Sequence, residues 1–390
     1  MRVAYVCADP GVPVFGTKGS SVHVQAVIRA LLRRGLKVTL FASRFDGPLP
    51  ADLAAVTCVP LPLPPKGATR IREAALLAAN EDLAAALERS GPFDLVYERY
   101  SLWSYAAMGY AQRTGVPGLL EVNAPLIDEQ IRHRELINRA GAMQVAQRLF
   151  RTATALLAVS QEVAAYLRTF ANETSIVVVP NGVDPDRFPV RPRSASHPTY
   201  TVGFVGTLKP WHGLEVLLAA FIQLHQRLPS ARLLLVGDGP ERDKLEAQVN
   251  ASGLAPVVEF TGAVSPEAIP GLLARMDVAT APYPSRERCY FSPLKLFEYM
   301  AAGLPVVASQ VGQVADILTH GETGLLCPPG DPEALMHALV ALHDSPALRV
   351  KLGAAGRHLV LGQYTWDAVA GRILAIAQGQ LVAQEWASYA

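Results

Sequence analysis

Short apolar runs alternate with longer amphipathic stretches along most of the chain. The runs Arg2–Ala8 and Lys37–Ser43 predict buried strands, and the stretch from Val22 to Arg34 between them predicts a helix that Gly35 ends. Further strands are expected at Leu95–Tyr97, Gly118–Val122, Ala155–Val159 and Ile176–Val179. The same alternation resumes at Thr201. Strands that alternate with helices predict parallel sheets covered on both faces.

Proline and charge interrupt this pattern near the middle of the chain. The stretch from Val183 to Tyr200 has no hydrophobic period and is rich in proline. We therefore expect a first domain at 1–185, a linker at 186–199 and a second domain at 200–365. The first half opens with a strand–helix–strand unit whose first turn is rich in glycine, and the second half repeats the scheme.

Composition narrows the class of protein. The 390 residues, half of them hydrophobic, are enough for two domains that each bury a core. A net charge of +1 argues against a nucleic-acid-binding protein. The four cysteines lack the spacing of a metal site or a disulfide framework and fit a reducing compartment. We expect a cytoplasmic protein without a signal peptide or a transmembrane helix.

The most informative segment begins at Cys289 and ends at Ser309. Ser292 suits the N-cap of a helix and Pro293 its first position, while Gly303 suits the left-handed residue that follows a helix. The backbone N–H groups at Leu294 and Lys295 would then attract an anion.

Lys295 is unusual because a cation in the first turn opposes the helix dipole. A bound diphosphate would offset this, and Glu298, one turn further on, could accept hydrogen bonds from ribose hydroxyls. The alternative is a weak Lys295–Glu298 ion pair on a surface helix. Against it, the helix is apolar nearly all round, which indicates burial. The apolar positions are Leu294, Leu296, Phe297, Tyr299 and Met300.

The stretch Tyr290–Gly303, and with it nearly the whole chain, resembles the retaining glycosyltransferases of the GT-B fold and is similar to family 4 among them. That fold has two Rossmann-like, doubly wound parallel-sheet domains that face a central cleft. The family usually carries two glutamates spaced Glu-x7-Glu. Here Glu298 stands at the second position, but Tyr290 occupies the first.

The resemblance implies a specific activity. A nucleoside diphosphate sugar, with a UDP-sugar favoured and a GDP-sugar as the second choice, would bind the second domain. The first domain would hold a hydroxyl acceptor, which could be a glycan, a lipid-linked molecule or a small molecule. The anomeric configuration would be retained, and the segment 366–390 would return as a helix to the first domain. No cofactor or metal is implied, since the sugar nucleotide is a substrate.

The loop after the first strand of the second domain departs from the family. Relatives usually carry an arginine and a lysine where this chain has Thr207 and His212, between Gly206 and Gly213. Lys209 is the one full cation in this loop and could replace the clamp on the diphosphate, although an exposed loop lysine is the alternative. Lys295, Lys209 and Asn123, which stands where many relatives have a histidine, are therefore the catalytic candidates.

The remaining site candidates follow from position. The donor-binding set is Gly206, Thr207, His212, Val264, Tyr290, Phe291, Ser292, Leu294, Glu298, Gly16 and Gly19, of which the last two belong to a glycine loop in the first domain. Glu121 and His23 are the acceptor-binding candidates. A basic region could bind an anionic acceptor or the inner membrane face, or be a solvated helix surface. It consists of Arg132, Arg134, Arg139, Arg148 and Arg151.

Two other functions stay open on the sequence alone. A nucleotide-sugar epimerase could use the same fold, but no convincing acid–base set is evident. A non-catalytic sugar-nucleotide-binding protein would account for the missing first glutamate. The oligomeric state is not indicated.

Overall fold

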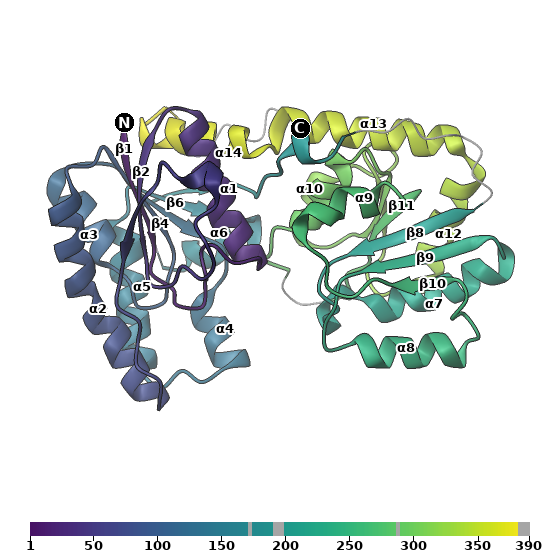
Figure 1. Cartoon of the computed structure of the whole chain (residues 1–390), viewed down its shortest axis with the longest axis horizontal. Coiled ribbons are helices and arrows are strands. Elements are labelled where there is room, and N and C mark those ends of the chain that lie inside the picture. The colour runs from purple at the N-terminus through teal and green to yellow at the C-terminus, as the bar shows by residue number, and fades with distance from the viewer. Residues whose placement is uncertain (171–173, 190–198, 286–288, 381–390) are drawn as a thin grey trace. The chain divides into compact units, whose positions relative to one another are not determined.

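Residues 1–170, 174–189, 199–285 and 289–380 are described by the computed structural model of the chain, shown in Figure 1. The chain divides into two compact units. Unit 1 comprises Met1–Asn181, Tyr290–Ser292 and the chain from Trp366 onward, and unit 2 comprises Gly182–Cys289 and Pro293–Thr365. The expected linker 186–199 lies mostly outside the described residues. Its start contains a 3-10 turn, η2 (Pro185–Arg187), which is part of unit 2.

Unit 1 is built on a seven-stranded parallel sheet in the order β3-β2-β1-β4-β5-β6-β7. Its strands are β1 (Arg2–Cys7), β2 (Lys37–Ala42), β3 (Thr57–Pro60), β4 (Leu95–Arg99), β5 (Gly118–Val122), β6 (Ala155–Ala158) and β7 (Ser175–Val178). The strand order reverses between β1 and β4. Ligands of open parallel sheets bind at such a reversal, outside the carboxyl ends of the strands.

Helices cover both faces of this sheet. They are α1 (Gly19–Arg33), α2 (Thr69–Ser90), α3 (Ala106–Thr114), α4 (Leu126–His133), α5 (Arg139–Thr152), α6 (Gln161–Arg168) and α14 (Trp366–Ala377). Figure 1 shows α2 and α3 on one side and α1 with α14 on the other. Arg33 on α1 donates a 3.0 Å hydrogen bond to Asp367 on α14. The last described helix therefore packs on the first helix of the chain.

Unit 2 is built on a six-stranded parallel sheet in the order β10-β9-β8-β11-β12-β13. Its strands are β8 (Tyr200–Val205), β9 (Ala231–Val236), β10 (Val258–Phe260), β11 (Val278–Ala281), β12 (Val306–Ser309) and β13 (Leu325–Cys327). Its helices are α7 (Leu214–Arg227), α8 (Arg242–Ala251), α9 (Ile269–Leu273), α10 (Leu294–Ala301), α11 (Gly312–Ile317), α12 (Pro332–Asp344) and α13 (Pro346–Gln363). Here the order reverses between β8 and β11, which makes the ends of these strands the expected ligand edge.

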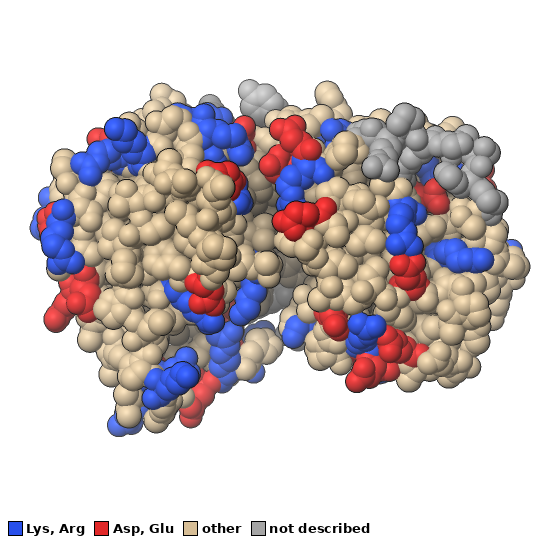
Figure 2. Space-filling model, in the orientation of Figure 1, with Lys and Arg blue, Asp and Glu red and all other residues tan. Residues whose placement is uncertain are grey.

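Each unit has its own hydrophobic core, because its strands are apolar on both faces. Tyr5, Phe41 and Phe150 are fully buried in unit 1, and Phe204 and Phe221 in unit 2. Figure 2 shows acidic and basic side chains interspersed over the visible face of each unit. The predicted architecture of two parallel-sheet, Rossmann-like domains is confirmed. Among the described residues, no helix combines the length and the apolar character that a membrane span requires.

Candidate active site

Helix α10 lies against the carboxyl end of β8 in unit 2. The Tyr299 hydroxyl accepts a 2.7 Å hydrogen bond from the Val205 backbone N–H, at the last residue of the strand. Leu296, Phe297 and Tyr299 are completely buried, so the prediction of a buried helix is confirmed. Gly303 follows α10 with φ +67°, the left-handed conformation that was predicted for it. The first turn of α10 is thus held at the edge where a ligand is expected.

The predicted start of this helix is wrong by one residue. α10 begins at Leu294, Pro293 occupies the N-cap position, and no side chain caps the helix. The Ser292 hydroxyl instead accepts a 3.1 Å hydrogen bond from the Asn181 backbone N–H, and the Ser292 carbonyl accepts one of 3.0 Å from the Asn181 amide. Ser292 is engaged in this long-range contact, which a local sequence pattern does not encode. The first N–H groups of α10 are left without the expected cap.

Lys295 carries the most perturbed positive charge of the site. Its Nζ atom is buried and has no hydrogen-bond partner among the described residues. It lies 4.0 Å from the ring centroid of Phe204, a cation–π contact. Burial lowers the pKa of Lys295 to about 7, although Glu298 opposes this shift. A buried amine without a hydrogen-bonding partner is costly in the free protein and would gain strongly from an anion.

Gly206 leaves the space beside this amine open. A Cβ atom on Gly206 would lie 2.8 Å from the Lys295 Nζ, and the backbone there has φ +146°. Any side chain at position 206 would therefore be strained and would crowd the amine. The glycine and the lysine lie far apart in the sequence of unit 2, and the fold brings them together.

Glu298 lies one turn after Lys295 on α10. Burial raises its pKa to about 7, while the positive charges of Arg187 and Lys295 act in the opposite direction. The two side chains form no ion pair with each other in the described part of the chain. The alternative of a Lys295–Glu298 ion pair on a surface helix is therefore wrong.

Three loops meet at the same edge of unit 2. The Leu208 N–H donates to the Asp238 carbonyl at 2.9 Å, and a Cβ atom on Gly237 would lie 2.1 Å from the Gly206 carbonyl oxygen. The glycines after β9 are therefore required by the close approach of two backbones. The loop after β10 carries Val264, which is half-buried.

The other candidates in the loop after β8 contact one another. The His212 Nδ1 lies 2.5 Å from the Thr207 carbonyl oxygen, which braces the loop from within. The Lys209 amine lies 5.5 Å from the ring centroid of Trp211. Thr207 and His212 thus fix the shape of the loop, and the role of Lys209 as a second clamp stays a prediction.

In unit 1, Glu121 is the centre of a buried polar cluster at the end of β5. It accepts a 2.8 Å hydrogen bond from the Tyr97 hydroxyl and lies 3.0 Å from His23 Nε2 and 3.3 Å from Arg99. Burial alone would raise the pKa of Glu121, but His23, Arg99 and Tyr97 together lower it to about 2. The two acceptor-binding candidates, Glu121 and His23, are thus paired with each other, and Glu121 is a poor proton acceptor at neutral pH.

Asn123 directly follows β5. Its Nδ2 atom is buried and has no hydrogen-bond partner among the described residues. A buried amide N–H without a partner is a donor available to a ligand.

The glycine loop of unit 1 is fastened to the helix that follows it, because Gln25 on α1 donates a 3.0 Å hydrogen bond to the Gly16 carbonyl. Gly19 begins α1 itself, three residues earlier than the predicted start at Val22.

The segment Tyr290–Ser292 belongs to unit 1, although it precedes α10 in the chain. The Tyr290 hydroxyl donates to Glu129 on α4, and the Tyr290 carbonyl accepts a 2.9 Å hydrogen bond from the Ser160 hydroxyl. Tyr290 and Phe291 are half-buried. The residue at the position of the missing first glutamate is therefore held by a carboxylate of unit 1.

Several residues with clear roles were not among the candidates. Arg99 and Tyr97 hold Glu121, and Arg187 acts on the charge of Glu298. Arg99 could have been found, because it pairs in register with Glu121 at the ends of two adjacent strands. No local signal marks Arg187, which lies more than a hundred residues before Glu298. Within the described ranges, no three His, Cys, Asp or Glu side chains gather to hold a metal ion.

Comparisons with known proteins identify the class. Residues 17–187 match the family model described as Glycosyltransferase Family 4, and residues 199–345 match the one described as Glycosyl transferases group 1. A sucrose-phosphate synthase from Thermosynechococcus elongatus has a similar structure, with a TM-score of 0.74 at 24% identity over 97% of this chain and 98% of that one. Anabaena Alr3699/HepE in complex with UDP has a TM-score of 0.73 at 19% identity, over 97% and 100% of the two chains. The fold is therefore GT-B, and each of the two matched segments is similar to a glycosyltransferase domain.

Two curated relatives are named for mannosyl transfer to phosphatidylinositol or its mannoside. The chain is 37% identical over 203 residues to a phosphatidyl-myo-inositol mannosyltransferase of Mycobacterium leprae, covering 51% of this chain and 52% of that protein. It is 29% identical over 225 residues to a GDP-mannose-dependent alpha-(1-6)-phosphatidylinositol monomannoside mannosyltransferase of Mycobacterium tuberculosis, covering 55% and 58%. The chain thus spans about half the length of the curated relatives that it matches.

Proposed function

We propose that this protein is a retaining glycosyltransferase that moves a hexose from a nucleoside diphosphate donor to a hydroxyl acceptor. The observation that carries the proposal is the buried Lys295 amine, which has no hydrogen-bond partner among the described residues and lies beside Gly206 at the start of α10. An amine held in this state has its pKa lowered to about 7. A diphosphate would supply the missing negative charge.

The donor diphosphate binds at the start of α10 in this proposal. Backbone N–H groups of the first turn, which include Leu294 N–H, donate to phosphate oxygens, and the helix dipole adds to the attraction. Lys295 stabilises the charge that grows on the leaving diphosphate, so its contribution is largest in the transition state. Glu298 accepts hydrogen bonds from the ribose, and Val264 contacts the base through its backbone.

Retention follows from the choice of proton acceptor. An inverting enzyme needs a general base on the acceptor side. Glu121 is held ionised by His23 and Arg99 with a pKa of about 2, which makes it too weak a base. Asn123 cannot take a proton and instead donates to the sugar or the acceptor. The departing phosphate therefore takes the proton of the acceptor hydroxyl. The hydroxyl then attacks the anomeric carbon from the same face as the departing phosphate, and the configuration is retained.

The substrates are proposed from the relatives. The curated relatives are named for mannosyl transfer to phosphatidylinositol and its mannoside, and one is named as dependent on GDP-mannose. We therefore rank GDP-mannose first and a UDP-hexose second, which reverses the preference from the sequence alone. The acceptor is proposed to be a polyol or glycan that carries a phosphate group. Contact with a membrane surface would be peripheral.

A ligand screen tests the proposal. UDP, GDP, ADP and TDP would each be added at 100 times an expected dissociation constant, where binding adds about 2.7 kcal/mol of stability. We expect one or two nucleotides to raise the melting temperature of the wild type but not of the Lys295→Met variant. A melting temperature that no nucleotide changes would overturn the proposed donor site. A bound sugar nucleotide that is isomerised without an acceptor would instead indicate an epimerase.

A further inference from the structure

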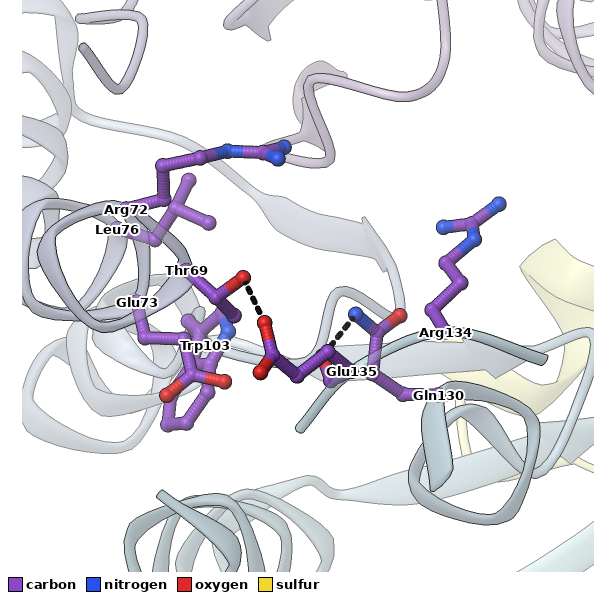
Figure 3. Close-up of a pocket in the computed structure, with 8 residues that line it drawn as sticks. All are labelled: Thr69, Arg72, Glu73, Leu76, Trp103, Gln130, Arg134 and Glu135. Carbon is purple, nitrogen blue, oxygen red and sulfur yellow. Dashed lines mark hydrogen bonds between the residues drawn. The ribbon is translucent and has the colours of Figure 1, made fainter. Parts of the chain in front are cut away.

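Unit 1 contains a cavity of about 280 Å³ that the donor site does not use. It is lined by Thr69, Arg72, Glu73, Leu76, Trp103, Gln130, Arg134 and Glu135, which Figure 3 shows. These residues come from the start of α2, the segment before α3, α4 and the residues that follow α4. We propose that this cavity binds the phosphate ester of a polyhydroxylated acceptor. The acceptor role rests on the proposed glycosyltransferase function, whereas the binding chemistry does not.

Hydrogen bonds that do not involve Arg72 or Arg134 hold the walls of the cavity in place. Both carboxylate oxygens of Glu73 accept backbone hydrogen bonds, from Ile137 at 3.0 Å and from Asn138 at 2.9 Å. The Thr69 hydroxyl donates to Glu135 at 2.5 Å, and the Gln130 amide donates to the Glu135 carbonyl at 3.0 Å. The segment after α4 is thus fastened to α2, and the cavity is a fixed feature of the fold.

Arg72 and Arg134 provide two cations that the protein itself does not neutralise. Neither guanidinium has a hydrogen-bond or ion-pair partner among the residues that the structure describes. In Figure 3 they lie on either side of Glu135 and extend away from it. Two unpaired guanidinium groups at one cavity suit a phosphate, which accepts bidentate hydrogen bonds.

The rest of the lining selects hydroxyl groups beside the phosphate. Glu135, Gln130 and Thr69 offer carboxylate, amide and hydroxyl groups, which pair with the hydroxyls of a sugar or a cyclitol. Trp103, which is only 5% exposed, and Leu76 supply an apolar surface for the C–H face of a ring. The volume corresponds to roughly nine water molecules at about 30 Å³ each, which suits a single ring with its phosphate.

The cavity lies at the edge of the sheet where chemistry is expected. α4 begins at Leu126, three residues after Asn123. Gln130 lies four residues further along this helix, a rise of about 6 Å along the helix axis. One short helix therefore connects the cavity with the unsatisfied Asn123 amide at the carboxyl end of β5. A phosphate held by Arg72 and Arg134 would position an acceptor hydroxyl towards that edge.

Matched arginine variants test the proposal by direct binding. Arg72→Gln, Arg134→Gln and the double variant remove the charge at the cavity. Arg70→Gln and Arg89→Gln change arginines of α2 that are exposed, as Arg72 and Arg134 are, but do not line the cavity. Calorimetric titration with myo-inositol 1-phosphate, inorganic phosphate and myo-inositol would be made on each full chain. Melting temperatures and titration with the nucleoside diphosphate confirm that the fold and the donor site are intact.

We expect the wild type to bind myo-inositol 1-phosphate more tightly than it binds inorganic phosphate or myo-inositol. Each cavity variant should lose about tenfold in affinity, the usual effect of one charge-assisted hydrogen bond, with the control variants unchanged. Equal losses in the control variants would mean diffuse attraction to a basic surface and would overturn the proposal. The proposal would also be overturned if saturable binding were absent both from this titration and from the vesicle experiment described next. Loss of nucleotide binding or turnover alone would instead count against the proposed function.

A second arm distinguishes a free acceptor from a lipid headgroup. Phosphatidylcholine vesicles that contain phosphatidylinositol would be compared with vesicles in which phosphatidylglycerol supplies the same charge. Binding that prefers phosphatidylinositol and is lost in the double variant identifies a lipid-linked acceptor. Binding of the soluble phosphate without vesicle binding identifies a free one, and both results support the cavity. Equal binding to both vesicles that survives in the double variant would contradict it.

Discussion

Replacing Lys295 by methionine should have opposite effects on stability and on ligand binding. In the free protein the amine is buried, has no hydrogen-bond partner among the described residues, and has its pKa lowered from 10.5 to about 7. Methionine keeps much of the length of the side chain and removes the charge. The variant should therefore be more stable than the wild type and should bind the nucleoside diphosphate more weakly.

The size of the stability gain follows from the pKa shift. Each pKa unit corresponds to about 1.36 kcal/mol, so the penalty has a ceiling of about 5 kcal/mol. The amine contacts the Phe204 ring, which reduces the penalty. We expect a gain of about 2 kcal/mol at pH 7, or roughly 4–8 °C in the melting temperature of a domain of this size.

The pH dependence provides a second check on the same variant. Between the native pKa of about 7 and the unfolded value of 10.5, the unfolded chain binds a proton that the native protein does not. Wild-type stability should therefore gain from this group as the pH rises from 7 towards 10.5, while the penalty is fully present below pH 7. The methionine variant should lack this contribution.

Thermal unfolding across this pH range and calorimetric titration with the nucleotide measure both effects. Lys351→Met, which changes an exposed lysine on α13 of the same unit, is the control and should alter neither. We expect Lys295→Met to lose at least tenfold in nucleotide affinity. A variant that is less stable than the wild type and binds nucleotide normally would refute the reasoning, because it would show that the amine is satisfied within the protein.

Four further predictions concern the donor, the acceptor side and the chemistry. Glu298→Gln should weaken nucleotide binding about tenfold in calorimetry, since the carboxylate is assigned to ribose hydroxyls. Its melting temperature should be no lower than that of the wild type, because burial raises the pKa of this carboxyl to about 7 and so disfavours its charge. Glu121→Gln should destabilise unit 1 by about 3 kcal/mol at neutral pH. Because His23 and Arg99 hold the pKa of Glu121 at about 2, the wild type should lose this contribution as the pH falls from about 4.5 to 2, and acid unfolding of the variant should lack it. Transfer should survive EDTA, and loss of activity that Mg²⁺ or Mn²⁺ restores would contradict the metal-free mechanism. The product of an α-linked donor should be α-linked by proton NMR, and a β-linked product would mean that a general base has been missed.

The fold was predictable because its signals are local and repeated. Runs such as Lys37–Ser43 and Gly118–Val122 are short and mostly apolar, which is typical of strands in a covered parallel sheet. The predicted ends of these strands differ from the observed ones by a residue or so. Burial of α10 was predictable as well, since the helix is apolar nearly all round, and Leu296, Phe297 and Tyr299 are indeed completely buried.

The candidate site was predictable only in part, because its remaining contacts join distant segments. Ser292 is a residue type that often caps helices. Its hydroxyl instead accepts a hydrogen bond from the backbone N–H of Asn181, more than a hundred residues away in the chain. Tyr290 is likewise held by Glu129 and Ser160 in unit 1. The pairing of Glu121 with His23 needs the register of the sheet and the position of α1 together. No period or motif encodes such pairs.

The central claim is that the chain transfers a sugar from a nucleotide donor bound at Lys295. Its most direct test is the release of nucleoside diphosphate from GDP-mannose and from UDP-glucose, with myo-inositol 1-phosphate as acceptor and mass spectrometry of the products. We expect one donor to yield its nucleoside diphosphate together with a glycosylated acceptor, and Lys295→Met to lose most of this activity. Nucleotides that bind to the wild type while every donor stays intact would contradict the account and would indicate a sugar-nucleotide-binding protein without catalytic activity.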